Sequence, residues 1–382
     1  MLPDCAVEGA VVDVEGAPAP EVLPVVRAPA RQDLNAPRNS ELLKKPLQDV
    51  SELLGYEDGI FDYVDHVSGA LQNLGNTCYL NAMLHVLARI PSIRRWCARH
   101  QLQFGQDPGH PADCVLCALA FDLSHLAVDL TGEPASPRTV LRRAGWSQGA
   151  FADFNQHDAH EAFSLLMDAC EGIDATAASF LGLSELDNNG GTNSCRYSTP
   201  KWKAFGGIEL SAVTCQACGH SEGQYQMWDC LSLAVPAQAV TVEHLLSNHW
   251  GAEPLRDKDD RCERPACMAP RRRVQEKHLK RWPTILALHL KRWRVVSVIP
   301  YHEEKVDTNV SFENVLLVNT EHPPYHLRGV VVHAGAAGGG HYVAYVRAPD
   351  NFWYFCNDWA PPRLSQIDEV LRAEAYLLFY EQ

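Results

Sequence analysis

The chain has 382 residues, of which 46% are hydrophobic and 21% are charged, so it can bury a full core and form two or three structural units. This composition excludes collagen-like, coiled-coil and wholly disordered proteins. The longest uncharged stretch, residues 329–346, contains five Gly and two His, which favours a packed hairpin over a membrane span. No export signal is visible, so thirteen Cys favour reduced, metal-bound or catalytic thiols, and we expect an intracellular protein of the cytoplasm or nucleus.

Charge is unevenly distributed along the chain, whose formal net charge is −14. Residues 1–66 contain thirteen Asp or Glu against five Lys or Arg, and residues 1–40 contain no Trp, Tyr or Phe. We therefore expect residues 1–68 to form a disordered, acidic extension rich in Pro and Ala, with a short amphipathic piece at 40–54. Residues 261–294 have the opposite bias, eleven basic against two acidic side chains, which is typical of a solvated face.

Helices are predicted first and strands later in the globular remainder, residues 69–382. Residues 77–87 follow a Gly-Asn-Thr turn and place three Leu on one helical stripe, and Asn155 caps a second helix whose third position is Asp158. Apolar or alternating runs predict strands at 284–290, 327–333, 341–347, 352–356 and 376–380. This order favours an α+β fold over a doubly wound sheet.

Cys78 is a candidate nucleophile because it lies at the predicted start of the first helix. The N-terminus of a helix favours negative charge, so we expect the pKa of this thiol to be lowered. The same backbone N–H groups are suited to hold a developing oxyanion. The alternative is an inert Cys buried in a helix.

His341 is a candidate base, since it follows three consecutive Gly that leave the backbone open. A hairpin turn centred on residues 349–350 would place His341 opposite Asp358, with Asn357 one position away. A one-residue bulge would exchange these two partners, either of which can fix the imidazole tautomer. His333 is the competing base, but it lies in an apolar strand without an obvious carboxylate partner.

Five segments carry motifs, the first two in the predicted helical part and the others in the predicted strand part. They are LQNLGNTCYLN at 71–81, QHDAHE at 156–161, LALHLKRW at 286–293, GGHYVAY at 339–345 and WYFCND at 353–358. The first resembles the Cys box, and the last two the His box, of the ubiquitin-specific proteases, a family of papain-like deubiquitinating enzymes. The match covers about residues 69–382. Ala162, Trp293 and His85 depart from the family pattern, and we expect these departures to alter packing without removing a catalytic group.

The resemblance implies a papain-like cysteine protease fold. It has a helical thumb at about 70–197, zinc-bearing fingers at about 198–283 that cradle ubiquitin, and a β-rich palm at about 284–382. The implied reaction is thiol-dependent hydrolysis of the isopeptide or peptide bond after the C-terminal Gly of ubiquitin, without a catalytic cofactor. The implied partners are ubiquitin, ubiquitinated proteins and a regulatory protein, and no membrane. The alternatives are an inactive ubiquitin-binding scaffold and a zinc-ribbon nucleic-acid module on residues 261–294, which leaves both boxes unexplained.

The resemblance also implies catalytic roles for five residues. Cys78 would be the nucleophile and His341 the base. Asn357 would orient the base, with Asp358 adjacent and sharing the work, and Asn73 would supply a side-chain donor to the oxyanion hole.

Four further residues are implied to bind substrate. Asp158 occupies the place of an acid that meets the arginines of the Leu-Arg-Gly-Gly tail of ubiquitin, and Gln156 lies beside it. Gly339 and Gly340 fit the wall of a narrow channel, where backbone must approach the Gly-Gly end closely.

Two close Cys pairs, Cys215 with Cys218 and Cys262 with Cys267, are suited to one tetrahedral structural zinc ion per chain. The family often has such a site at the tip of the fingers. The second pair has a four-residue spacer instead of two, so a degenerate fingertip without metal is the alternative. Another CxxC pair, Cys114 to Cys117, lies in an apolar run with no second pair apparent nearby, and we interpret it as core packing.

Overall fold

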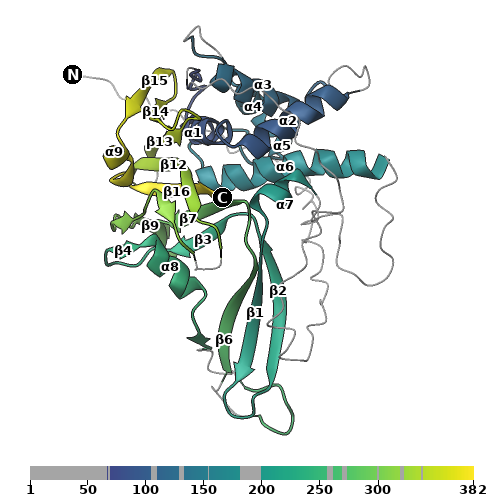
Figure 1. Ribbon diagram of the computed structural model, residues 1–382, viewed down its shortest axis with the longest axis vertical. Helices are drawn as coiled ribbons and strands as arrows, with labels where there is room; N and C mark the ends of the chain where they lie inside the picture. The colour runs from purple at the N-terminus through teal and green to yellow at the C-terminus, as the bar shows by residue number, and fades with distance from the viewer. Residues whose placement is uncertain are drawn as a thin grey trace, which may run out of the picture. The chain divides into compact units, whose positions relative to one another are not determined.

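The computed structural model describes residues 67, 69–104, 110–128, 133–153, 155–180, 199–255, 261–268, 273–298, 301–318, 322–336 and 339–382 (Figure 1). The predicted N-terminal extension and its amphipathic piece lie outside the described residues, apart from Val67.

Helices dominate the first part of the described chain. They are α1 (Cys78–Leu87), α2 (Pro91–Phe104), α3 (Val115–Val128), α4 (Arg138–Leu141), α5 (Arg143–Trp146), α6 (Ala159–Phe180) and α7 (Pro200–Phe205). All ten residues of α1 are buried, because it packs between the other helices and the strands β12, β13 and β14. A central helix of this kind is apolar around most of its circumference and does not carry a single stripe. No helix in the described ranges is long and apolar enough to cross a membrane.

The cap of α6 differs from the prediction. Asp158, directly before the helix, accepts hydrogen bonds through Oδ1 from the backbone N–H groups of His160 (2.7 Å) and Glu161 (3.0 Å). The predicted cap, Asn155, instead donates its amide to Asp153 Oδ2 at 2.7 Å. A carboxylate satisfies the unpaired N–H groups and also interacts favourably with the positive end of the helix dipole, which explains why Asp158 caps the helix.

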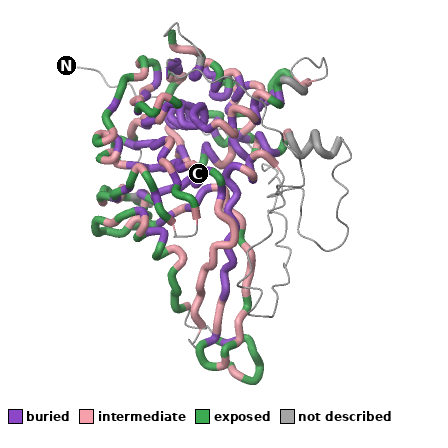
Figure 2. Tube along the Cα trace, in the orientation of Figure 1, coloured by how far each residue is buried: buried purple, intermediate pink, exposed green. Residues whose placement is uncertain are grey.

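A four-stranded antiparallel sheet has the order β2-β1-β6-β5, formed by β1 (Gly207–Cys215), β2 (Ser221–Trp228), β5 (Glu253–Pro254) and β6 (Arg273–Arg281). It extends away from the helices as a long ribbon (Figure 1). Only its central strand β1 is largely buried, and β2 and β6 are mostly half-buried (Figure 2). The ribbon therefore has little core of its own.

An eight-stranded sheet has the order β15-β14-β13-β12-β16-β7-β3, with β11 paired to β12. Its strands are β3 (Leu231–Ala234), β7 (Ile285–Lys291), β11 (Val315–Leu316), β12 (Tyr325–Ala336), β13 (Gly339–Arg347), β14 (Trp353–Asn357), β15 (Ala360–Ser365) and β16 (Ala375–Glu381). Short pairs join β4 (Val240–Thr241) to β10 (Val310–Ser311) and β8 (Trp293–Val298) to β9 (Tyr301–Lys305), and the helices α8 (Val242–His249) and α9 (Ile367–Leu371) complete the described elements. The predicted α+β class and the predicted strands are confirmed.

The two faces of the large sheet bury separate apolar clusters. Leu377 and Phe379 of β16 join the cluster that contains α1, whereas Leu378 and Tyr380 join the cluster on the opposite face. Successive strand residues point to opposite faces, so a central strand covered on both sides is apolar throughout. This explains why the final strand reads as a continuous apolar run in the sequence.

The hairpin of β13 and β14 corrects the predicted register. Arg347 pairs with Trp353, one residue later than expected, because the connecting loop has a third residue, Asn351, with a left-handed φ of +68°. A three-residue hairpin loop with one left-handed residue is a common alternative to the two-residue turn. His341 therefore does not face Asp358 across the strands.

Candidate active site

Cys78 is the first residue of α1 and is buried, with 1% of its surface exposed. Burial raises the pKa of the thiol, and the charge of Asp358 acts in the same direction; the backbone N–H groups of Tyr342, Tyr79 and Cys78 itself oppose them. The expected lowering of the pKa was therefore wrong for this state, because desolvation outweighs the helix N-terminus. The hydrogen bond to the Tyr342 backbone also places the thiol beside β13, because Tyr342 directly follows His341 in that strand.

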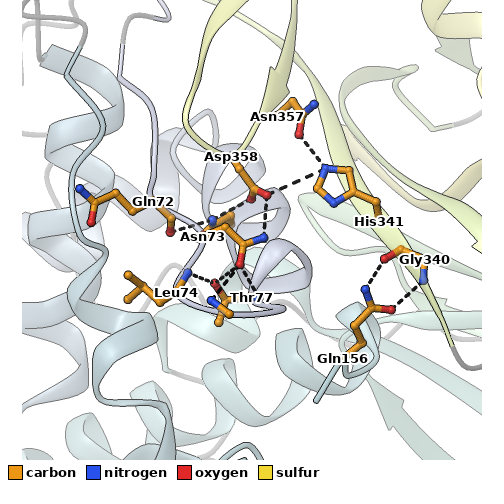
Figure 3. A network of polar contacts seen from close by, with 11 residues as sticks. Gln72, Asn73, Leu74, Thr77, Gln156, Gly340, His341, Asn357 and Asp358 are labelled. Atoms are coloured by element: carbon orange, nitrogen blue, oxygen red, sulfur yellow. Dashed lines mark hydrogen bonds and ion pairs between the residues drawn. The ribbon is translucent and has the colours of Figure 1, made fainter. Parts of the chain in front are cut away.

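His341 lies at the start of β13, and Asn357 is its hydrogen-bond partner. His341 Nε2 is 2.7 Å from Asn357 Oδ1 and 3.9 Å from Asp358 Oδ2 (Figure 3). Because an amide oxygen accepts, Nε2 carries the proton, which leaves the lone pair on Nδ1. Among the described residues the ring makes no hydrogen bond with Cys78. Such contacts are often loose in sites without substrate.

Asp358 holds the segment that precedes the helix. Its Oδ2 accepts a hydrogen bond from Asn73 Nδ2 at 2.8 Å (Figure 3). Its Oδ1 accepts one from Asn81 Nδ2 at 2.8 Å, and its backbone oxygen accepts from Leu71 N–H at 3.0 Å. Its left-handed φ of +44° lies in the tight turn between β14 and β15. Asn81 was missed by the sequence reasoning. The signal was a polar residue three positions after Cys78 in a mostly apolar helix.

Asn73 is fixed at both ends of its amide. Its Oδ1 accepts the backbone N–H groups of Gly75 and Thr77, each at 3.1 Å, and its nitrogen donates to Asp358. Within the described residues this nitrogen donates one hydrogen bond, so its second N–H is available. The amide is thus preorganised beside the N-terminus of α1.

Gln156 and Gly340 contact each other. Gly340 N–H donates to Gln156 Oε1 at 2.7 Å, and Gln156 Nε2 donates to the Gly340 carbonyl (Figure 3). A Cβ at Gly340 would lie 2.5 Å from His333 Cε1, whereas one at Gly339 would meet no heavy atom within 4 Å. Close packing against the buried His333 side chain therefore requires glycine at 340 and not at 339. Gly338 lies outside the described residues.

Asp158 has a second partner besides the N-terminus of α6. Its Oδ2 accepts a hydrogen bond from the Tyr376 hydroxyl, which lies 3.0 Å from His289 Nε2. His289 Nδ1 is in turn 2.9 Å from Ser232 Oγ. This chain of polar groups reaches from the large sheet to Asp158 and holds its carboxylate in place. The sequence did not reveal Tyr376, His289 or Ser232 as partners because they are distant along the chain.

His333, the competing base, packs among aromatic rings. Its ring centroid is 4.6 Å from that of Tyr342 and 5.2 Å from that of Trp293. Burial and the charge of Lys305 lower its pKa to about 4. These surroundings describe a packing residue behind Gly340, so His341 remains the candidate base.

The four predicted metal ligands lie together at the end of the ribbon. Cys215 Sγ is 3.9 Å from Cys267 Sγ, and Cys218 Sγ is 3.7 Å from Cys262 Sγ. Zinc–sulfur bonds of about 2.3 Å in a tetrahedron place neighbouring sulfurs about 3.8 Å apart. A turn in which Cys267 N–H donates to Arg264 O at 2.9 Å accommodates the longer spacer. The thiols fit a closed tetrahedral metal site.

A second cluster was missed. His100 and His110 lie with Cys114 and Cys117, and their candidate ligand atoms are all within 4.8 Å of one another. Core packing alone was therefore an incomplete interpretation of this CxxC pair. The available signal was the two His in the preceding residues.

The packing of a buried helix that begins with Cys78 against a strand that begins with a Gly-Gly-His sequence is the arrangement of papain-like cysteine proteases. The family model described as ubiquitin carboxyl-terminal hydrolase matches residues 70–380. The chain therefore belongs to the ubiquitin carboxyl-terminal hydrolase family, which confirms the resemblance drawn from its motifs.

Individual relatives agree with this membership. The chain is 30% identical over 327 residues to ubiquitin carboxyl-terminal hydrolase 25 of Arabidopsis thaliana and 29% identical over 336 residues to ubiquitin carboxyl-terminal hydrolase 2 of Rattus norvegicus. These matches cover 82% and 81% of this chain but 47% and 53% of the relatives, so the chain spans about half the length of these curated relatives.

Solved structures support the fold. A SAGA DUB module containing Ubp8, bound to monoubiquitin, matches with a TM-score of 0.67 at 22% identity, over 86% of this chain and 71% of that chain. A yeast SAGA DUB module matches with a TM-score of 0.68 at 22% identity, over 85% and 70% of the two chains.

Proposed function

We propose that the chain is a thiol-dependent deubiquitinase that hydrolyses the bond after the C-terminal Gly of ubiquitin. The observation that carries the proposal is the hydrogen bond between His341 and Asn357, because His341 lies on β13, the strand whose backbone contacts the Cys78 thiol. Family membership supports the substrate class. Ubiquitin and ubiquitinated proteins are the proposed partners. A regulatory partner is also proposed, because the matched Ubp8 chains are in modules with Sgf11, Sus1 and Sgf73.

In the first half of the reaction, Cys78 Sγ attacks the carbonyl carbon of the terminal Gly while its proton passes to His341 Nδ1. Nδ1 is the available nitrogen because Nε2 donates to Asn357. A buried, protonated thiol needs this base, since its raised pKa leaves little thiolate at neutral pH. His341 then protonates the leaving lysine amine, and a thioester to Cys78 remains.

In the second half, water attacks the thioester carbonyl, gives its proton to His341, and releases the ubiquitin carboxylate and the Cys78 thiol. Both halves form an oxyanion. The unoccupied N–H of Asn73 and the backbone N–H groups at the start of α1 are the proposed donors. Asp358 acts in this scheme by holding Asn73, with a smaller electrostatic contribution to His341.

The proposed path of the substrate tail passes Gly339 and Gly340 toward Cys78. Gly340 and Gln156 bond to each other in the free protein, so we propose that the tail exchanges these bonds for its own when it enters. Asp158, which two N–H groups and Tyr376 hold in place, is the proposed partner of the tail arginines.

We propose that the cluster of Cys215, Cys218, Cys262 and Cys267 holds one structural zinc ion. The ion would supply a cross-link between chain segments at the end of a ribbon that has little core. Four thiolates leave no position for a catalytic water. The ribbon is the proposed finger region, which would contact the globular body of ubiquitin.

The rival nucleic-acid function has little support. Within the described part of the basic segment, Arg273 pairs with Glu263 at 3.0 Å and Lys277 with Glu209 at 3.3 Å. Arg292 is buried. These contacts neutralise or cover cations that phosphate binding would require.

A ubiquitin derivative with an electrophile at its C-terminus tests the assignment. We expect wild-type protein to form a covalent adduct and to cleave a ubiquitin C-terminal fluorogenic amide, whereas Cys78→Ala binds ubiquitin without either reaction. Cys170→Ser, which removes another buried thiol, is the matched control and should still react. Adduct formation by Cys78→Ala would refute the nucleophile. Ubiquitin binding by a wild-type protein that forms no adduct and shows no turnover would favour the inactive scaffold.

A further inference from the structure

A second set of four metal-ligand side chains lies among the helices, apart from the thiols of the ribbon. His100 comes from the C-terminal part of α2, and His110 from the connection that follows. Cys114 is the residue before α3, and Cys117 lies in the first turn of α3. His100 Nε2 is 3.2 Å from Cys114 Sγ, and His110 Nε2 is 3.2 Å from Cys117 Sγ. The ligand atoms of the four residues lie within 4.8 Å of one another.

These separations suit one tetrahedral ion. Metal–nitrogen bonds of about 2.0 Å and metal–sulfur bonds of about 2.3 Å place the ligand atoms of a tetrahedron about 3.3–3.8 Å apart. The observed nitrogen–sulfur distances are close to this range, before any adjustment to an ion. The set of two imidazoles and two thiols is one of the standard structural zinc sets, and a CxxC pair at the start of a helix is a common half of it.

Burial gives an independent argument. His100 and Cys114 are each only 4% exposed, and His110 and Cys117 are half-buried. The imidazoles also pack on Phe104, whose ring centroid is 5.2 Å from that of His100 and 6.0 Å from that of His110. Polar groups in such surroundings cost free energy unless they have strong partners, and thiol–imidazole hydrogen bonds are weak. An ion bound by all four would give one ligand atom of each residue a strong partner.

We propose that His100, His110, Cys114 and Cys117 bind a second zinc ion, which joins the end of α2 to the start of α3. The ion is structural because all four positions are filled by protein. α3 packs against α1, and Arg89, just after α1, donates through Nη2 to the Leu126 carbonyl of α3 at 2.5 Å. The metal therefore stabilises the helices behind Cys78. The proposal does not depend on the proposed deubiquitinase activity.

Metal analysis of the purified full chain tests the proposal directly. We expect about two zinc ions per wild-type chain and about one in Cys117→Ser and in His110→Ala. Cys97→Ser, which removes a buried thiol of α2 outside the cluster, is the matched control and should keep both. One zinc per wild-type chain, with the same content in Cys117→Ser, would overturn the proposal.

Cobalt substitution keeps the test decisive if the ligand variants fold poorly. Cys262→Ser disables the ribbon site and leaves this cluster intact, so that protein should still bind about one cobalt ion per chain. Its visible d–d bands should be those of tetrahedral cobalt, and its near-ultraviolet charge-transfer intensity should correspond to two thiolates in place of four. A Cys262→Ser chain that folds and binds no cobalt would exclude a site at this cluster. A chelator should also lower the unfolding temperature of this variant, which a cluster without metal would not show.

Discussion

Replacing Gly340 by alanine tests how tightly the strand that carries His341 is positioned. The added Cβ would lie 2.5 Å from His333 Cε1 and 2.7 Å from the Ala334 carbonyl oxygen, whereas ordinary contact begins at 3.4 Å. His333 must therefore move by about 0.9 Å or more, and the rings of Tyr342 and Trp293 leave it little room. Overpacking of this kind costs about 1–3 kcal/mol.

We expect a loss of catalytic rate as well as a loss of stability. If β13 moves instead of His333, the two hydrogen bonds to Gln156 are weakened and the adjacent His341 is displaced. A misplacement of about 1 Å can cost about 100-fold in rate. We therefore expect kcat/KM on a ubiquitin C-terminal reporter to fall by about this factor in Gly340→Ala.

The neighbouring glycine provides the matched control. Gly339→Ala meets no heavy atom within 4 Å in the free protein, so its unfolding free energy should stay within about 0.5 kcal/mol of wild type. Because Gly339 lies on the proposed path of the substrate tail, this variant is a control for stability and not for activity. Chemical denaturation of both variants makes the comparison, and initial-rate kinetics are measured on Gly340→Ala. Equal unfolding free energies of the two alanine variants would refute the steric argument, because only one of them has a neighbour to displace.

Three further outcomes are expected. Because burial raises the pKa of Cys78 above the ordinary 9.0, its alkylation rate should still increase with pH near that value, and Asp358→Asn should shift the profile to lower pH; a plateau already reached in mildly acidic solution would contradict this. Asn357→Ala should lower kcat through the loss of the bond to His341 with little change in stability, whereas Asp358→Ala should also lower the unfolding free energy by about 1–3 kcal/mol, since two amides lose their acceptor; kinetics and denaturation of both variants separate the roles. Cys262→Ser should lose about one zinc ion and raise KM more than it lowers kcat; unchanged metal content would exclude the ribbon site.

Local pattern and spacing in the sequence determined much of the protein. The periodicity of apolar residues predicted helices before strands, and the helix predicted at 77–87 begins one residue later, at Cys78, and ends at Leu87. The two Cys pairs of the ribbon were predicted from spacing alone, and their sulfurs lie together. Helices and strands depend on residues close in the chain, and two close Cys pairs are a characteristic set of metal ligands. One sequence is therefore sufficient to find these features.

Tertiary structure decided the details that depend on distant residues. One extra loop residue shifts the register of β13 and β14, and the hydrogen-bond partner of His341 is Asn357. Asp358 instead accepts hydrogen bonds from two Asn side chains. The sign of the Cys78 pKa shift was set by burial, which sums contributions from many elements and has no local signature. His100 meets the Cys114 thiol because α2 packs against α3, and that packing geometry, unlike helical periodicity, cannot be read from the spacing of the residues.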